Sequence, residues 1–458
     1  MDNQTAENLA DSAAREQERE ERRRRSEESK EKKEEGRKRQ SEMIDDFLDG
    51  GKTVEVPLRT RGYYGGMLAY MLQQVIKEDG WEVIRMLGEG DGADPRYRQV
   101  SLGPDKSVSV LGKGGLFLVR GEERLAVLIM SMPATMLIAY AAEEQKEAAE
   151  LFVAGIKLRM REQNIYSGGN ISFDGSIRFL QLEKRNWEDL ALDPDKKHEI
   201  ETNSVRLLRH NTELKKYGIP CKRGIILAGG PGTGKTLISK VLMNNSTGIT
   251  CIEAHPSLVE NPGFIYDIYE LARDLRPCIL FLEDVDLVGY DRDRSGYSRG
   301  AGLASLLNEL DGAEDCHGIV TVAMTNNLKS LDKALVNRPS RFDRVIIMEL
   351  PEIRERRYQI GRISKRIPLS EELQEYLAQH TDGYSPAQIQ DILQSIIINR
   401  LGDEKDLENE PFNRDEVDRA MASIYGKSNR KSMGFAARNG EHNADKCEGE
   451  NAEAGLAA

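Results

Sequence analysis

Residues 224–236 read GIILAGGPGTGKT, and this stretch decides the fold of the chain. The apolar run over 224–227 predicts a buried strand, and the pattern LISKVLMNN that begins at Leu237 predicts a helix. Between them, residues 229–236 fit the spacing G-x-x-x-x-G-K-[ST] in the strand–loop–helix context that this pattern requires. Glycines permit a tight loop whose backbone N–H groups surround phosphate, and the helix N-terminus adds its positive dipole end. The stretch therefore predicts a nucleotide-phosphate site in an α/β domain.

Two side chains of this loop have the chemistry to hold a nucleotide. Lys235 is expected to reach the β- and γ-phosphates of a nucleoside triphosphate, and the Thr236 hydroxyl is expected to bind Mg²⁺. The predicted nucleotide-binding set also includes Gly229, Gly230, Pro231, Gly232, Thr233, Gly234 and Leu237.

A second apolar run ends in acidic residues. Residues 278–282 read CILFL, and Glu283 and Asp284 follow them. Such a run predicts a buried parallel strand, and ligands bind at the carboxyl ends of such strands. We expect Glu283 to organise Mg²⁺ and Asp284 to orient or deprotonate the attacking water, although either acid could be the base.

Polar residues further along complete the candidate catalytic set. The run IVTVAMTNN predicts a buried strand that ends near Asn326, whose amide can hydrogen-bond the attacking water or the γ-phosphate, or can simply cap the strand. Arg341 and Arg344 follow in the segment RPSRFDR. Their planar donors suit a phosphoryl group presented by a neighbouring subunit; the alternative is salt bridges on a solvated turn.

The composition excludes several classes of protein. A net charge of −12 argues against binding to nucleic acid or to anionic lipid. Five cysteines without CxxC spacing argue against a disulfide scaffold or a structural zinc site, and favour the reducing cytoplasm. The run of residues 125–142 carries no formal charge and is just long enough to span a membrane. Pro133 in the middle of the run instead favours two buried strands joined by a turn. We therefore expect no membrane association.

The flanks of the chain differ in charge and periodicity. Residues 15–40 hold 21 charged side chains in 26 positions, with acid–base pairs four residues apart that favour a solvated helix. Residues 52–180 show the pattern of a small α/β domain, and residues 182–428 alternate strands and helices as a parallel sheet covered by helices requires. The last 30 residues are polar and predict a disordered tail.

Several motifs together resemble one known family. YGIPCKRGIILAGGPGTGKT is similar to the Walker A region of the AAA ATPases, ILFLEDVD to their Walker B motif, and LLNELDG to the segment that follows it. MTNN resembles their sensor-1 motif, LDKALVNRPSRFDR their second region of homology, and DGYSPAQIQDI a lid motif that approaches the nucleotide. The resemblance covers roughly residues 187–426, about half of the chain.

This resemblance implies ATP and Mg²⁺ as cofactors, ATP hydrolysis, and a homo-oligomeric ring, a hexamer, that remodels, unfolds or disassembles a protein substrate. It also implies a P-loop fold with a small helical lid, preceded by an α/β N-terminal domain. The predicted divisions are 1–51, a charged helical or disordered segment; 52–180, an α/β domain that takes substrate or partner; 181–350, the large ATPase subdomain; 351–428, the helical lid; and 429–458, a disordered tail.

The resemblance also assigns roles outside the phosphate loop. It makes Asn326 the sensor, and Arg341 and Arg344 arginine fingers that act on a neighbouring subunit. Gly383 and Ala387 would approach the nucleotide from the lid. The adenine pocket would be framed by Asp189 and the segment before Tyr217.

Two departures from the family pattern leave alternatives open. The usual Walker B ending Asp-Glu is reversed here to Glu283-Asp284, as in the branch that includes the mitochondrial Rieske-protein translocase. The aromatic residue that usually grips substrate in the first pore loop has no clear match; Phe264 is a candidate, or else a helix-packing residue. The alternatives are therefore a nucleotide-gated scaffold with slow turnover, or a membrane-associated protein translocase.

Overall fold

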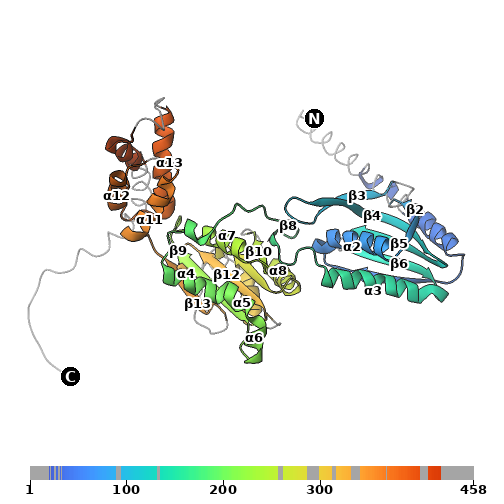
Figure 1. Cartoon of the computed structure of the whole chain (residues 1–458). Coiled ribbons are helices and arrows are strands. Elements are labelled where there is room, and N and C mark those ends of the chain that lie inside the picture. Colours follow the sequence, from blue (N-terminus) through green and yellow to red (C-terminus); the bar gives the residue numbers. More distant parts are fainter. Residues whose placement is uncertain are drawn as a thin grey trace, which may run out of the picture.

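Figure 1 shows the computed structural model of the chain, with an antiparallel sheet at one end, a parallel sheet in the middle and a group of helices at the other end. The structure describes residues 20, 22–24, 27–28, 31, 34–88, 94–131, 135–255, 261–285, 299–311, 316–331, 341–367, 369–402 and 411–423. This order confirms the predicted fold class, a parallel-sheet α/β domain with C-terminal helices behind an N-terminal sheet domain.

The first sheet is antiparallel, with strand order β1-β6-β5-β4-β2, and β3 also pairs with β4. Its strands are β1 (Thr53–Arg59), β2 (Glu82–Leu87), β3 (Arg96–Ser101), β4 (Ser107–Arg120), β5 (Glu123–Ser131) and β6 (Thr135–Ala142). The uncharged run 125–142 forms the antiparallel pair β5–β6, which confirms the predicted hairpin, while its turn at Pro133 lies outside the described residues. Among the helices that the structure describes, none has the length and apolar character needed to cross a bilayer.

Helices cover both faces of this sheet. On one face lie α2 (Gly65–Glu78) and α3 (Lys146–Glu162), whose apolar sides pack on the strands. On the other face, the end of a helix spanning residues 34–47 places Ile44 and the following Leu48 against Phe117. Within the described residues, the charged N-terminal segment is therefore helical over 34–47, and its last turns are part of the sheet's core.

The second sheet has the order β13-β9-β12-β11-β10-β7-β8 and is parallel except for β8. Its strands are β7 (Asn170–Phe173), β8 (Ile177–Phe179), β9 (Lys222–Gly229), β10 (Thr250–Ala254), β11 (Cys278–Leu282), β12 (Ile319–Thr325) and β13 (Arg344–Met348). The predicted division at residue 180 lies after β7 and β8, but the pairing of β7 with β10, and of β8 with β7, places both strands in this second sheet.

Side chains alternate between the two faces of the second sheet because its strands have a period of two residues. On β9, Ile225 and Leu227 pack with α7 (Lys235–Asn245), while Ile226 faces the opposite side. That opposite side is covered by α8 (Pro262–Asp274) and α9 (Arg299–Asp311). Shorter helical segments are Gly62–Tyr64, Glu143–Gln145, Trp187–Asp189, α4 (Pro194–Glu201), Thr202–Arg206, α5 (Leu207–Arg209), α6 (Asn211–Lys216) and Leu328–Ser330.

Aromatic and charged contacts join the two sheet domains. Tyr63 of the N-terminal domain meets Phe173 of β7 edge-on at 5.3 Å, and Phe173 in turn stacks on Phe264 of α8 with ring centroids 5.2 Å apart. Arg61 forms an ion pair with Asp267 at 3.0 Å and another with Glu270, both on α8. These contacts fix the N-terminal domain to α8. Residues 256–260, which precede α8 in the chain, lie outside the described residues.

Asp274, at the end of α8, should make stability pH-dependent. Burial raises the pKa of its carboxyl, partly offset by the hydrogen bond that Tyr64 Oη donates to Asp274 Oδ2 at 3.0 Å. Because the folded state then binds the proton more tightly than the unfolded state, stability is highest below the ordinary pKa of 3.8 and falls as pH rises through the folded-state pKa.

Asp274→Asn keeps an acceptor for Tyr64 and removes that titration. Its melting temperature relative to wild type should therefore rise as pH increases from about 4 to 7, measured by thermal scanning fluorimetry over the range in which both stay folded. Tyr64→Phe, which keeps the carboxyl, is the control and should keep the pH dependence. A difference between Asp274→Asn and wild type that does not change with pH would contradict the assignment.

The C-terminal helices form a small domain of their own. They are α11 (Ile353–Ser364), α12 (Glu371–His380), α13 (Pro386–Gly402) and a helical segment at 414–423. Ile360, Leu377 and Ile392 lie in its core. The buried Arg400 and Glu416 form an ion pair at 2.8 Å that joins α13 to the last helical segment.

Candidate nucleotide-binding site

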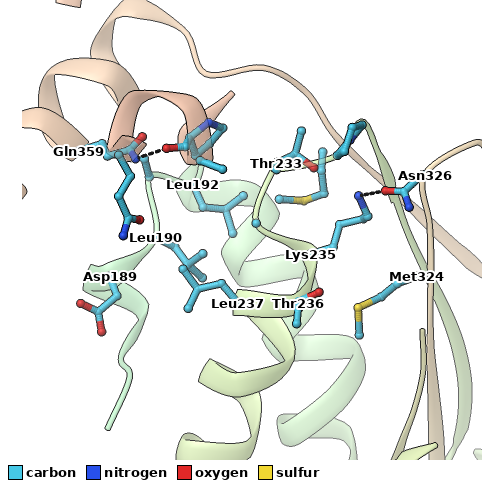
Figure 2. Close-up of a pocket in the computed structure, with 18 of the residues that line it drawn as sticks. Asp189, Leu190, Leu192, Thr233, Lys235, Thr236, Leu237, Met324, Asn326 and Gln359 are labelled. Atoms are coloured by element: carbon cyan, nitrogen blue, oxygen red, sulfur yellow. Dashed lines mark hydrogen bonds between the residues drawn. The ribbon is translucent and has the colours of Figure 1, made fainter. Parts of the chain in front are cut away.

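A pocket of about 380 Å³ opens where the ends of the parallel strands meet the helical domain (Figure 2). It is bounded by the loop after β9, by the acids after β11, by the end of β12 and by helices α11 and α13. The residues that line it are Asp189, Leu190, Ala191, Leu192, Pro231, Gly232, Thr233, Gly234, Lys235, Thr236, Leu237, Glu283, Asp284, Met324, Asn326, Met348, Gln359, Arg362, Pro386, Ala387 and Gln390.

The loop between β9 and α7 has the conformation that its glycines predict. Gly232 and Gly234 have φ values of +79° and +97°, a region that side chains disfavour. Gly232 also lies against the helical domain, because its carbonyl accepts a hydrogen bond from Ala387 N at 3.2 Å. A Cβ at Gly232 would lie 2.9 Å from Ser385 Oγ and 3.0 Å from the Cβ of Ala387. The loop therefore fits the helical domain only with glycine at this position.

Gly232→Ala should weaken ATP binding by roughly 5- to 150-fold, since the added methyl must displace either the loop or α13 at a cost of roughly 1–3 kcal/mol. Isothermal titration calorimetry measures the effect. Gly248→Ala is the matched control, because Gly248 has a φ of +80° but no heavy atom within 4 Å of the added Cβ. This control should lose stability and keep ATP affinity. Equal loss of affinity in both variants would show that backbone strain alone is responsible.

A chain of hydrogen bonds joins three of the predicted site residues. Lys235 Nζ donates to Asn326 Oδ1 at 2.9 Å and to the carbonyls of Gly229 and Gly230 at 2.7 and 2.9 Å. Asn326 Nδ2 in turn donates to Asp284 Oδ1 at 3.1 Å. The strand order explains this arrangement, because β9, β12 and β11 are neighbours and their carboxyl ends meet at one edge.

The acids after β11 lie at the same end of the pocket as the loop. Asp284 has a φ of +48°, which is uncommon for a residue with a side chain and is found most often where function holds the backbone. Burial, and then the charge of the neighbouring Glu283, raise the pKa of the Glu253 carboxyl on β10. Thr236 and Glu283 both line the pocket, and a hydroxyl and a carboxylate fit Mg²⁺, which takes its other ligands from phosphates and water.

The helical domain closes the other end of the pocket. Ala387 lines it as predicted, whereas Gly383 is not among the lining residues. Asp189 lines it as well, and Arg362 Nη1 donates to Asp189 Oδ1 at 3.0 Å. The segment before Tyr217 forms α6 and does not line the pocket, so this part of the adenine-pocket prediction is wrong.

The two predicted arginine fingers lie outside the pocket of their own chain. Arg341 is 5% exposed, and its Nε and Nη2 atoms each donate to a carboxylate oxygen of Asp311, both at 2.6 Å. Arg344 begins β13 and is exposed to solvent. Of the two, only Arg344 is presented at the surface of the chain, where another subunit could meet it.

Phe264 is a core residue of α8. It is 7% exposed and stacks on Phe173, as described above. The helix-packing alternative for Phe264 is therefore the one that the structure supports, and the same holds for the buried Tyr269, whereas Tyr266 is exposed.

The four cysteines that the structure describes, Cys221, Cys251, Cys278 and Cys316, are buried and free. Burial raises the pKa of Cys251 to about 12, as expected for a thiol with no chemical role. Cys447 lies outside the described residues.

The strand–loop–helix cradle at the edge of a parallel sheet, with a buried lysine and two acids at the next strand end, defines a P-loop nucleotide-binding domain. Residues 225–350 match the family model described as ATPase family associated with various cellular activities (AAA). The chain therefore contains an AAA ATPase domain, which confirms the family resemblance of the sequence.

Two relatives match this part of the chain and cover different shares of their own length. An ATP-dependent zinc metalloprotease FtsH of Mycoplasma pneumoniae is 32% identical over 284 residues, which cover 59% of this chain and 38% of that protein. A proteasome-activating nucleotidase of Methanopyrus kandleri is 29% identical over 297 residues, which cover 61% of this chain and 67% of that protein. The chain thus spans well under half of the FtsH relative.

Proposed function

We propose that this chain is an ATPase that converts ATP and water to ADP and phosphate, assembles into a hexameric ring and uses the cycle to remodel a protein substrate. The observation that carries the proposal is the hydrogen-bonded chain Lys235–Asn326–Asp284 inside a pocket that the helical domain closes. The relatives named as a protease and a proteasome-activating nucleotidase favour a protein as the substrate.

The proposed reaction assigns one task to each side chain. Lys235 binds the phosphates, and Asn326 holds the attacking water in line with the γ-phosphorus. As the new P–O bond forms and the bond to the leaving ADP oxygen breaks, Asp284 accepts the proton of the water. Mg²⁺, held by Thr236 and Glu283, would supply positive charge next to the transferred phosphoryl group.

A ring completes this site from outside the chain. In the proposed ring, Arg344 of one subunit, which is exposed in the chain, stabilises the charge that develops on the γ-phosphate of the next, as arginine fingers do. Because such a site needs two subunits, turnover should depend on assembly.

Steady-state ATP hydrolysis across a series of protein concentrations tests the proposal, with Asp284→Asn as the inactive reference. Turnover per subunit should rise cooperatively as the ring assembles. Turnover that is constant across the whole series, or equal to that of Asp284→Asn, would contradict a shared-site ATPase.

The core position of Phe264 favours one second candidate, a nucleotide-gated scaffold that orders its subunits without gripping a polypeptide. The two functions differ in one measurement. A remodeller should hydrolyse ATP several-fold faster when an unfolded protein is added, whereas a scaffold should not respond. The cytoplasmic location of the protein stays a prediction.

A further inference from the structure

Two buried polar atoms without a hydrogen-bond partner belong to residues that line the nucleotide pocket. They are Gln359 Oε1, an acceptor, and Arg362 Nε, a donor, both on helix α11. Buried polar groups are nearly always hydrogen-bonded, so an unpartnered acceptor and donor at a binding site mark a place that a ligand can complete. Residues three apart on a helix lie on the same face, so the two side chains extend from one face of α11.

The other end of each side chain is held in place. Gln359 is 5% exposed, and its Nε2 donates to the carbonyl of Pro386 at 2.7 Å. Because a carbonyl can only accept, the orientation of this amide is fixed with Oε1 as the unsatisfied atom. Arg362 is anchored by its bond to Asp189. Neither group can turn away to satisfy itself without breaking a bond that it already makes.

The position of α11 in the pocket points to the base of the nucleotide. Figure 2 shows Gln359 and Asp189 at the opposite end of the pocket from Lys235 and Asn326. A nucleotide whose phosphates lie at Lys235 therefore directs its base toward α11. Apolar side chains line the space between these ends, as the flat face of a base requires; they include Leu190, Leu192, Leu237 and Met348.

The chemistry of the two atoms distinguishes the purine bases. Adenine has an amino donor, N6, next to ring nitrogens that accept, whereas guanine has the acceptor O6 at the position of that amino group. We propose that Gln359 Oε1 accepts a hydrogen bond from adenine N6, and that Arg362 Nε donates to the adjacent ring nitrogen. Gln359 then selects ATP over GTP, because O6 of guanine would oppose its oxygen. This inference rests on the proposed function, since it concerns the same nucleotide site.

The test compares three triphosphates by calorimetry in the presence of Mg²⁺: ATP, GTP, and purine riboside triphosphate, which lacks the amino group. Wild type should bind ATP roughly 10- to 100-fold more tightly than either of the others, the range of one well-placed base contact. Gln359→Leu should bind ATP and purine riboside triphosphate within about threefold of each other. Because this ratio is taken within one variant, a general loss of affinity does not affect it.

Gln374→Leu is the matched control. Gln374 lies near the start of α12, outside the pocket, and its Nε2 donates to the carbonyl of Leu369 at 2.7 Å. Replacing it with leucine therefore removes the same kind of hydrogen bond as Gln359→Leu does. This variant should keep the wild-type preference for ATP.

Two results would overturn the inference: equal binding of ATP and purine riboside triphosphate by wild type, or an unchanged preference in Gln359→Leu. The first remains decisive even if Gln359→Leu does not fold. Failure of wild type to bind any of the three would instead contradict the nucleotide site itself, so the two proposals fail in different ways.

Discussion

ATP binding should fall by roughly 100-fold when Lys235 is replaced with alanine. Lys235 is 8% exposed, and its ammonium group is held by Asn326 and by the carbonyls of Gly229 and Gly230, so that it faces the phosphate end of the pocket. Charge-assisted hydrogen bonds to buried groups contribute about 1.5–3 kcal/mol, which corresponds to a factor of roughly 10 to 100 in affinity. Calorimetric titration with ATP and Mg²⁺ measures the loss.

Lys240→Ala is the control for this prediction, because Lys240 is an exposed lysine on the same helix, α7, and does not line the pocket. It should bind ATP as wild type does. Circular dichroism separates binding from folding: Lys235→Ala should keep the wild-type helical signal. A variant that folds and still binds ATP with wild-type affinity would remove Lys235 from the site.

The parallel sheet could be predicted from the sequence because its central strands are continuous apolar runs. In β11, residues 278–282 are all fully buried, and a polar residue follows on the pocket side. The local sequence alone is therefore enough to predict this strand and where it ends. β7 has no such run. It joins the sheet through pairing of Asn170–Phe173 with β10, a contact between residues far apart in the chain. The predicted division at residue 180 failed for this reason.

The N-terminal segment shows the same limit. Its repeated acid–base pairs, such as Glu35 and Arg39 at 2.6 Å, describe an exposed helix correctly. The burial of Ile44 and Leu48 depends on Phe117 of β4, which no local pattern connects to them. Their spacing of four residues was the available signal, but one turn of apolar residues is too short to indicate a buried helix.

The two ends of the pocket differ in the same way. The loop at the phosphate end has a residue spacing that directly indicates phosphate binding, so Lys235 and Thr236 could be assigned to it from the sequence. The base end depends on how α11 packs against residues 187–192. Gln359 and Arg362 lie in a helix whose sequence is that of an ordinary charged surface helix. Only in the folded chain do their unpartnered atoms indicate a binding role.

Arg344→Ala should lower the turnover of ATP on the order of 10³-fold while leaving ATP affinity within a few-fold of wild type. Arg344 is exposed and lines no part of its own pocket, so its loss removes charge stabilisation only at a neighbour's γ-phosphate. Steady-state hydrolysis and calorimetry measure the two quantities. Arg341→Ala should differ, because the buried Arg341 donates two hydrogen bonds to Asp311: losing both bonds and the packing of the buried side chain should also lower thermal stability.

Mixing two inactive variants decides whether the finger acts between subunits. In a mixed ring, a Lys235→Ala subunit binds ATP poorly but still presents Arg344, and an Arg344→Ala subunit binds ATP but lacks its own finger. Where the first adjoins the second in the right order, a complete site forms, so the mixture should be clearly more active than either variant alone. An arginine that acted on its own chain would restore nothing, because neither subunit carries both groups. Recovery of activity therefore requires that the complete site be built from two chains.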